Sequence, residues 1–154
     1  MSSPTSCATL VPPRGPISFD ASEGEKVFNS IGCETCHKNT FVTAPAGTSI
    51  NGGAFKVPTA LANKVIHPFS DFLLHDVGTG DGIVQNGGLG TRIQLRTPPL
   101  WGLRARGRFM HDLRSHSLDD AIQRHGGQAA SVRSSFNALS TTNKTRVLRF
   151  LASL

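Results

Sequence analysis

The pentapeptide Cys33-Glu34-Thr35-Cys36-His37 is the most informative stretch of this 154-residue sequence. Its Cys-x-x-Cys-His spacing is typical of c-type haem attachment. Two thiols about one helical turn apart can add to the two vinyl groups on one edge of a porphyrin, and the adjacent imidazole can then bind the iron. We therefore predict one covalent haem c, attached through Cys33 and Cys36, with His37 as the proximal ligand of the iron.

A Cys-x-x-Cys pair also occurs in disulfides, in thioredoxin-like redox sites and in zinc sites. A thioredoxin-like site needs a βαβ context, and no strand typical of a parallel sheet precedes Cys33. A tetrahedral zinc site needs two further ligands, and Cys7 is the only other thiol. The pattern therefore favours haem, with a Cys33–Cys36 disulfide in a module without redox function as the remaining alternative.

Length and composition favour a single domain that is rich in loops. A chain of 154 residues can form one core. It has nine Phe, one Trp and no Tyr, but 16 Gly and nine Pro, which favours turns. We predict a mainly α, cytochrome c-like domain over residues 17–154, with several short helices and long loops wrapped around one covalently bound haem. Residues 1–16 are expected to form an irregular lead-in.

Three helices can be placed by apolar spacing and by signals at their ends. An apolar stripe at helical spacing predicts a first helix between Asp20, its expected N-cap, and Gly32. Ser117, which is followed by acidic residues, starts a second helix that Gly126-Gly127 stops.

The third helix closes the chain, and the segments between the helices are expected to be loops. Residues Ser140–Asn143 offer N-caps for this helix. Its apolar residues fall on one face and need a partner; they are Val147, Leu148, Leu151 and Leu154. Residues 41–60 and 76–90 are rich in Gly and other turn-forming residues, so we predict loops there.

The chain is basic, with a formal charge of +6. Six arginines fall in one short window against the single acid Asp112; they are Arg92, Arg96, Arg104, Arg106, Arg108 and Arg114. Arginine pairs well with carboxylates, so we expect Arg96 to contact a haem propionate. The same basic edge is expected to dock an acidic redox protein partner, and we do not expect a nucleic-acid partner.

The sequence offers no membrane segment. No stretch approaches the ~18 apolar residues of a spanning helix, and residues 1–30 lack the continuous apolar region of a signal peptide. Covalent attachment of haem c is normally completed outside the cytoplasm, so we nevertheless expect a periplasmic or otherwise extracytoplasmic protein. We interpret Cys7 as incidental.

Several side chains are candidates for the second axial position of the iron. Met110 is the only methionine besides the initiator, and it follows a Pro-rich segment on a loop that can reach the far face of the ring. A thioether there raises the reduction potential, and we assign Met110 as the distal ligand. His75 and His111 are its competitors, whereas His116 and His125 flank a helix and are expected to be exposed or capping.

Several segments resemble the carboxy-terminal haem domain of the bacterial di-haem oxidoreductases, a peroxidase-like and thiol-oxidoreductase-like family. The segments from Arg96 onward are also similar to the high-potential haem domain of di-haem cytochrome c peroxidases. The resemblance covers roughly residues 15–154. It lies in Gly24–Phe28 with the haem motif, Ser70–Gly78, Arg96–Leu103, Phe109–Asp112 and His125-Gly126-Gly127.

The resemblance implies His37 as the proximal ligand, Met110 as the distal ligand, and a first and a last helix that pack on each other. It also implies a second haem domain, upstream, with its own attachment motif, whereas this sequence contains one such motif. The family's Asp-Gly-Arg after Met-His is Asp112-Leu113-Arg114 here, so leucine replaces a turn glycine.

Two functions are consistent with these residues. The first is a c-type cytochrome domain that binds haem and transfers one electron through a His/Met-ligated iron. Its partner would be a redox protein or an upstream haem domain of the same parent protein. The alternative is a truncated di-haem peroxidase-like oxidoreductase acting on peroxide or another small oxidant. That activity needs an open iron and a proton-moving group such as His75 or His111.

Overall fold

The computed structural model describes residues 18–154, so the predicted lead-in at residues 1–16 and Cys7 lie outside the described residues. This part of the chain contains four α-helices, several single 3-10 turns and three two-stranded antiparallel sheets. The α-helices are α1 (Phe19–Ser30), α2 (Leu118–Gln123), α3 (Ala130–Ala138) and α4 (Thr141–Leu151). The 3-10 turns are η1 (Cys33–Thr35), η2 (Asn51–Gly53), η3 (Thr59–Leu61), η4 (Leu89–Ile93), η5 (Leu103–Ala105) and η6 (Gly127–Ala129).

The three sheets are short ribbons, and they make the expectation of a mainly α fold wrong. The pairs are β1 (Phe41–Val42) with β4 (Val65–Ile66), β2 (Ser49–Ile50) with β3 (Phe55–Lys56), and β5 (Leu74–His75) with β6 (Leu95–Arg96). The content is mixed α and β because short stretches pair across strands, and three of them, β1, β2 and β3, lie within the residues 41–60 that were predicted to be loop. Residues 76–88, in contrast, are the loop that was expected.

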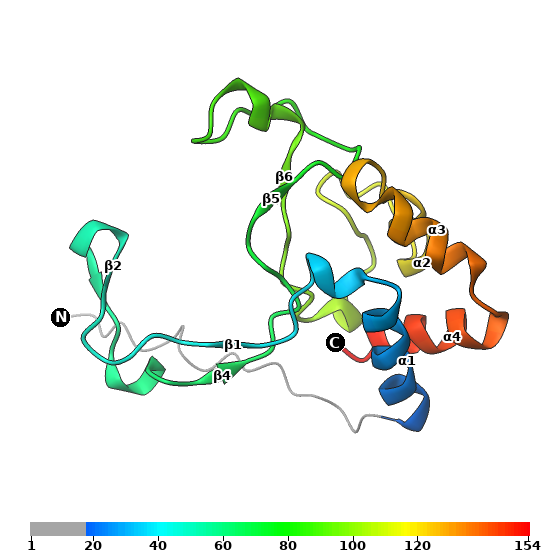
Figure 1. The fold of residues 1–154 in the computed structure, drawn as a ribbon, viewed down its shortest axis with the longest axis horizontal. Helices are drawn as coiled ribbons and strands as arrows, with labels where there is room; N and C mark the ends of the chain where they lie inside the picture. Colours follow the sequence, from blue (N-terminus) through cyan, green and yellow to red (C-terminus); the bar gives the residue numbers. More distant parts are fainter. Residues whose placement is uncertain (1–17) are drawn as a thin grey trace.

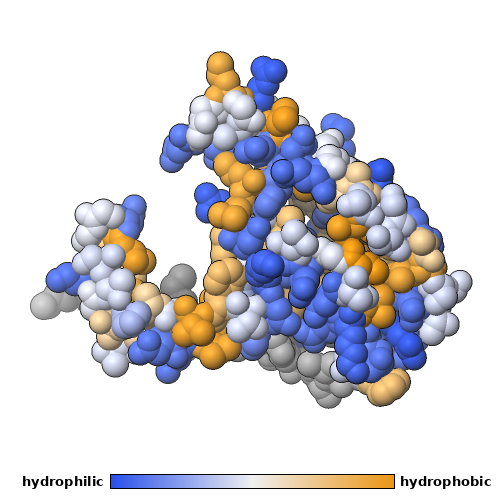
Figure 2. Space-filling model, viewed as in Figure 1, coloured by the Kyte–Doolittle hydropathy of each residue, from blue (hydrophilic) through white to orange (hydrophobic). Residues whose placement is uncertain are grey.

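The ribbons of β1 to β4 form an arm that extends away from the helices (Figure 1). Hydrophobic residues are visible along it in Figure 2, and the side chains of Val42, Ile50, Phe55 and Val65 are exposed. A two-stranded ribbon alone buries little apolar surface. The arm therefore adds little to the core, which lies among the helices.

Serine caps fix the beginnings of three helices. Ser117 Oγ accepts from the backbone N–H of Asp120 before α2, and Ser140 Oγ accepts from that of Asn143 before α4, so both predicted caps are confirmed. The cap of α1 is Ser18 rather than Asp20. Asp20 lies in the first turn of α1 instead, where its carboxylate pairs with arginines of α4.

The first and last helices pack on each other, as expected. Their backbones lie close together at Gly24, where an added Cβ would lie 2.5 Å from the carbonyl carbon of Arg146. The rings of Phe28 and Phe150 meet edge to face beside this point, with centroids 5.3 Å apart. The buried core cluster consists of Phe28, Phe69, Leu103, Phe136, Val147, Phe150 and Leu151.

Helix α3 has no counterpart among the sequence predictions. It contains one buried residue, Phe136, so its apolar stripe is too narrow to be read from spacing alone. Ser134 and Ser135 donate to the carbonyls of Ala130 and Ser131 and add to its polar face. Among residues 18–154, every helix is too short or too polar to cross a membrane.

Candidate haem site

The attachment motif forms a tight turn directly after α1. Gly32 adopts φ 95°, a left-handed conformation that favours glycine, and it turns the chain into the 3-10 turn at Cys33–Thr35. The backbone N–H of His37 then donates to the carbonyl of Cys33 over 3.0 Å. One turn therefore carries both thiols and the imidazole, and both thiols are free.

The two thiols lack the electrostatics of a redox-active pair. Burial raises the pKa of Cys33 to about 12, and burial also raises the pKa of Cys36. A thioredoxin-like site needs a thiol with a lowered pKa, because the thiolate is the nucleophile. Both thiols are therefore protonated at neutral pH, and Cys33 packs against the apolar core.

The imidazole of His37 is oriented by a distant carbonyl. Its Nδ1–H donates to the carbonyl oxygen of Phe69 over 2.9 Å, which leaves the lone pair of Nε2 available. A histidine that binds a metal typically donates its other N–H to a backbone carbonyl or carboxylate. Burial lowers the pKa of His37 to about 4, so the ring is neutral at physiological pH, as a metal ligand must be.

The carbonyl of Phe69 is held in place by the segment around it. The backbone N–H of Ser70 donates to the carbonyl of Lys38 over 3.0 Å, and that of Asp71 donates to the carbonyl of Cys36 over 2.7 Å. Phe69 is itself 1% exposed and adopts φ 50°. No sequence signal indicated this role, because the bond to His37 spans 32 residues.

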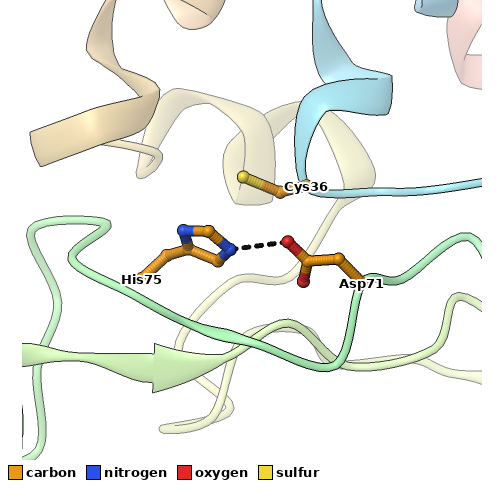
Figure 3. Close-up of side chains that lie close together, drawn as sticks. All are labelled: Cys36, Asp71 and His75. Carbon is orange, nitrogen blue, oxygen red and sulfur yellow. Dashed lines mark hydrogen bonds and ion pairs between the residues drawn. The ribbon is translucent and has the colours of Figure 1, made fainter.

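Cys36, Asp71 and His75 lie together at one edge of the motif (Figure 3). Nε2–H of His75 donates to Oδ2 of Asp71 over 2.7 Å. One potential ligand atom from each of the three residues lies within 4.8 Å of the others. Cys36 is also the second thiol of the Cys-x-x-Cys-His motif, so we interpret Asp71 and His75 as a polar pair beside that motif. The bond to Asp71 occupies Nε2 of His75, which weakens this residue as an axial-ligand candidate.

Met110 lies in a constrained loop. The bridge between Phe109 and Ser115 closes the loop, and both Met110 and Leu113 adopt left-handed φ angles, of 65° and 56°. Leucine thus keeps the backbone conformation that a turn glycine would give. Met110 is half-buried. The described residues that pack against the core do not include it.

An arginine from the end of α2 holds this loop. The guanidinium of Arg124 donates to both carboxylate oxygens of Asp112, over 2.9 and 2.5 Å, and to Oγ of the buried Ser115 over 3.1 Å. Hydrogen bonds from Arg124 hold the pKa of Asp112 well below its usual range. His111, the neighbouring ligand candidate, is exposed.

His125 is the site residue that sequence reasoning missed. Its ring lies beside that of His37, with centroids 6.4 Å apart and planes tilted by 50°. Nδ1–H of His125 donates to the carbonyl of Ala121 over 2.7 Å, so the ring does cap α2, but it is half-buried rather than exposed. His116, at the other end of α2, is exposed as expected.

The six clustered arginines are all exposed. Arg96 lies on β6, where it pairs with Leu74 of β5, and His75 follows on that strand. The strand pair therefore brings Arg96 close to the polar pair beside Cys36. The propionate contact of Arg96 stays a prediction.

These residues define a class of protein. Two free thiols one turn apart, followed by a neutral imidazole with an available Nε2, fit a haem-binding redox protein. The comparison with protein families agrees. Residues 6–154 match the family described as "di-haem oxidoreductase, putative peroxidase", and the chain belongs to this family. Neither the curated proteins nor the solved structures gave a match.

Proposed function

We propose that this chain is a c-type haem domain that transfers single electrons. Cys33 and Cys36 would hold the porphyrin through thioether bonds, and Nε2 of His37 would bind the iron. When bound, the haem supplies a one-electron redox couple. The observation that carries the proposal is the orientation of His37, because the Phe69 carbonyl fixes its tautomer and leaves Nε2 free.

The protein around the motif supports electron transfer in two ways. The aromatic rings of Phe28, Phe69 and Phe150 pack edge to face next to His37, and this apolar packing keeps water away from the imidazole. The exposed arginines beyond β6 offer a basic surface that would steer an acidic redox partner. The family is di-haem and this sequence has one attachment motif. We therefore propose that the second haem is carried by a partner, such as an upstream haem domain of the same parent protein.

Peroxidase-like chemistry is the second candidate, and the Asp71–His75 pair favours it. A carboxylate that orients an imidazole is a usual arrangement for moving protons, and this pair lies beside an attachment thiol. The activity would also need an open coordination position on the iron. A high-spin ferric resting spectrum and turnover of peroxide would support this candidate over electron transfer.

Expression of the full chain with c-type maturation machinery tests the proposal. We expect a mass increase of one haem and a pyridine haemochrome spectrum of the c type. Cys33→Ser with Cys36→Ser should abolish covalent attachment, and His37→Ala should abolish stable haem binding, whereas Cys7→Ser should retain both. A colourless chain with the mass of the bare polypeptide would refute the proposal. Attachment of c-type haem outside the cytoplasm also leads us to propose a periplasmic or otherwise extracytoplasmic location.

A further inference from the structure

We infer that the second axial ligand of the iron is His125, in place of the methionine predicted from the sequence. The inference rests on the proposed haem attachment through Cys33 and Cys36. The two imidazoles of His37 and His125 are the only pair of histidine rings in contact among residues 18–154. They come from the attachment turn and from the residues just after α2, and 88 positions separate them in the sequence.

The spacing of the rings fits two imidazoles on opposite sides of one metal ion. A metal–imidazole bond is about 2 Å long and the ring centre lies about 1 Å beyond the nitrogen, so two trans imidazoles have centroids about 6 Å apart. The observed separation is 6.4 Å. A tilt of 50° between the planes is compatible with this arrangement, because each ring can rotate about its own bond to the metal.

Both rings also present the same nitrogen. Nδ1–H of His37 donates to the carbonyl of Phe69, and Nδ1–H of His125 donates to the carbonyl of Ala121. Among the described residues, Nε2 of neither ring has a hydrogen-bond partner. Each imidazole is therefore held in the tautomer that metal ligation through Nε2 requires.

The backbone after α2 holds His125 firmly. The N–H of Gly126 donates to the carbonyl of Val77 over 2.8 Å, and the N–H of Gln128 donates to that of Asp76 over 2.8 Å. An added Cβ on Gly126 would already lie 3.4 Å from the Val77 carbonyl. Such docking fixes the ring position before a metal arrives, which is what an axial ligand needs.

The competing histidines do not share these properties. Nε2 of His75 is bound by Asp71, and His111 is exposed. Met110 is the rival assignment, and the Met110→Leu variant described below separates it from His125. Two imidazoles would give the iron a lower potential than an imidazole and a thioether, because Met/His ligation raises it. The inference therefore changes the expected redox range of the domain.

Spectra of the haem-loaded full chain test the assignment. We expect the ferric protein to be low-spin, without the weak long-wavelength band of an iron–thioether bond. His125→Ala should become high-spin, and added imidazole should restore the low-spin spectrum. Met110→Leu should retain it. His116→Ala, which removes an exposed histidine at the other end of the same helix, is the matched control and should match the unmodified protein.

Two further measurements keep the test decisive if His125→Ala fails to mature. His125→Met should gain the thioether band and shift the potential upward. Near-infrared magnetic circular dichroism of the unmodified protein distinguishes His/His from His/Met ligation directly. A thioether band that Met110→Leu removes, or a haem-loaded His125→Ala with an unchanged low-spin spectrum, would overturn the inference. Either result leaves the proposed function standing, whereas absence of covalent haem refutes that function itself.

Discussion

Replacement of Gly24 by alanine tests the helix crossing that supports the attachment turn. An added Cβ would lie 2.5 Å from the carbonyl carbon of Arg146 and 2.9 Å from Cβ of Phe150, and ordinary contact begins at 3.4 Å. The shortfall to the carbonyl carbon is therefore 0.9 Å. The carbonyl oxygen of Arg146 lies closer still. The neighbour is helix backbone, which cannot rotate away, so α1 and α4 would have to separate by more than about 1 Å.

The energetic cost of this separation can be bounded. Overpacking of this kind costs up to about 3 kcal/mol, and about 1 kcal/mol is recovered because alanine is the better helix former. We expect a net loss of about 2 kcal/mol, which lowers the midpoint of thermal unfolding by roughly 4–8 °C for a chain of this size. Circular dichroism of the haem-loaded chain measures the shift.

Gly107→Ala is the control for this experiment. Its added Cβ would meet nothing within 4 Å, and its φ angle is not left-handed. We expect a change of less than about 0.5 kcal/mol. If Gly24→Ala proved as stable as this control, the close approach of α1 and α4 would not exist in solution, and α4 would not support the attachment turn.

Three further predictions concern the site and the loop beside it. Because burial lowers the pKa of His37 from 6.5 to about 4, the unfolded chain binds more protons between these values. The contribution of His37 to the free energy of unfolding of the haem-free chain should therefore be fully present above pH 6.5 and fall as the pH approaches 4. Urea unfolding at several pH values measures this, and a free energy of unfolding that does not change with pH would contradict the prediction. Arg124→Gln should lower the midpoint of thermal unfolding more than Arg114→Gln does. The side chain of Arg114 is 81% exposed and reaches the same Asp112 carboxylate only at 3.8 Å. Equal shifts of the midpoint in the two variants would contradict the role of Arg124. Leu113→Asn should stabilise the chain by about 1 kcal/mol because asparagine tolerates the left-handed φ that leucine adopts, and a loss of stability in denaturant titrations would count against this.

The parts of the fold that sequence could predict are those fixed by neighbouring residues. The caps Ser117 and Ser140 bond to N–H groups three residues away, and the attachment turn lies within five residues. The caps and the attachment turn are each encoded within one or two helical turns of sequence, which is the range over which spacing carries information. The apolar stripes of the first and last helices predicted only that each helix needs a partner, and the packing of α1 on α4 was expected from the family resemblance.

The parts that sequence could not predict depend on contacts between distant segments. Residues 41–60 have turn-forming composition, yet three of their short stretches pair as strands, one of them with β4 at Val65–Ile66. His125 follows a helix and is followed by two glycines, a pattern typical of a solvent-exposed helix end. Only the docking of this helix end on Val77 brings the ring to His37. Phe69, which orients His37, carries no signal at all because its backbone carbonyl makes the contact.

The composition of the site depends on local structure, whereas the orientation of its imidazoles depends on contacts with distant segments. The thiols and the proximal imidazole belong to one turn, so any fold that forms this turn after α1 presents them together. The orientation of His37 depends instead on the backbone carbonyl of Phe69, which lies 32 residues away, and the position of His125 depends on the docking of Gly126 on the carbonyl of Val77. If haem is bound as we propose, a substitution that moves either segment would leave attachment intact while it changes the ligand field of the iron. It follows that changes in potential, rather than loss of haem, should be the common effect of mutations in the segments around residues 67–78 and 117–128.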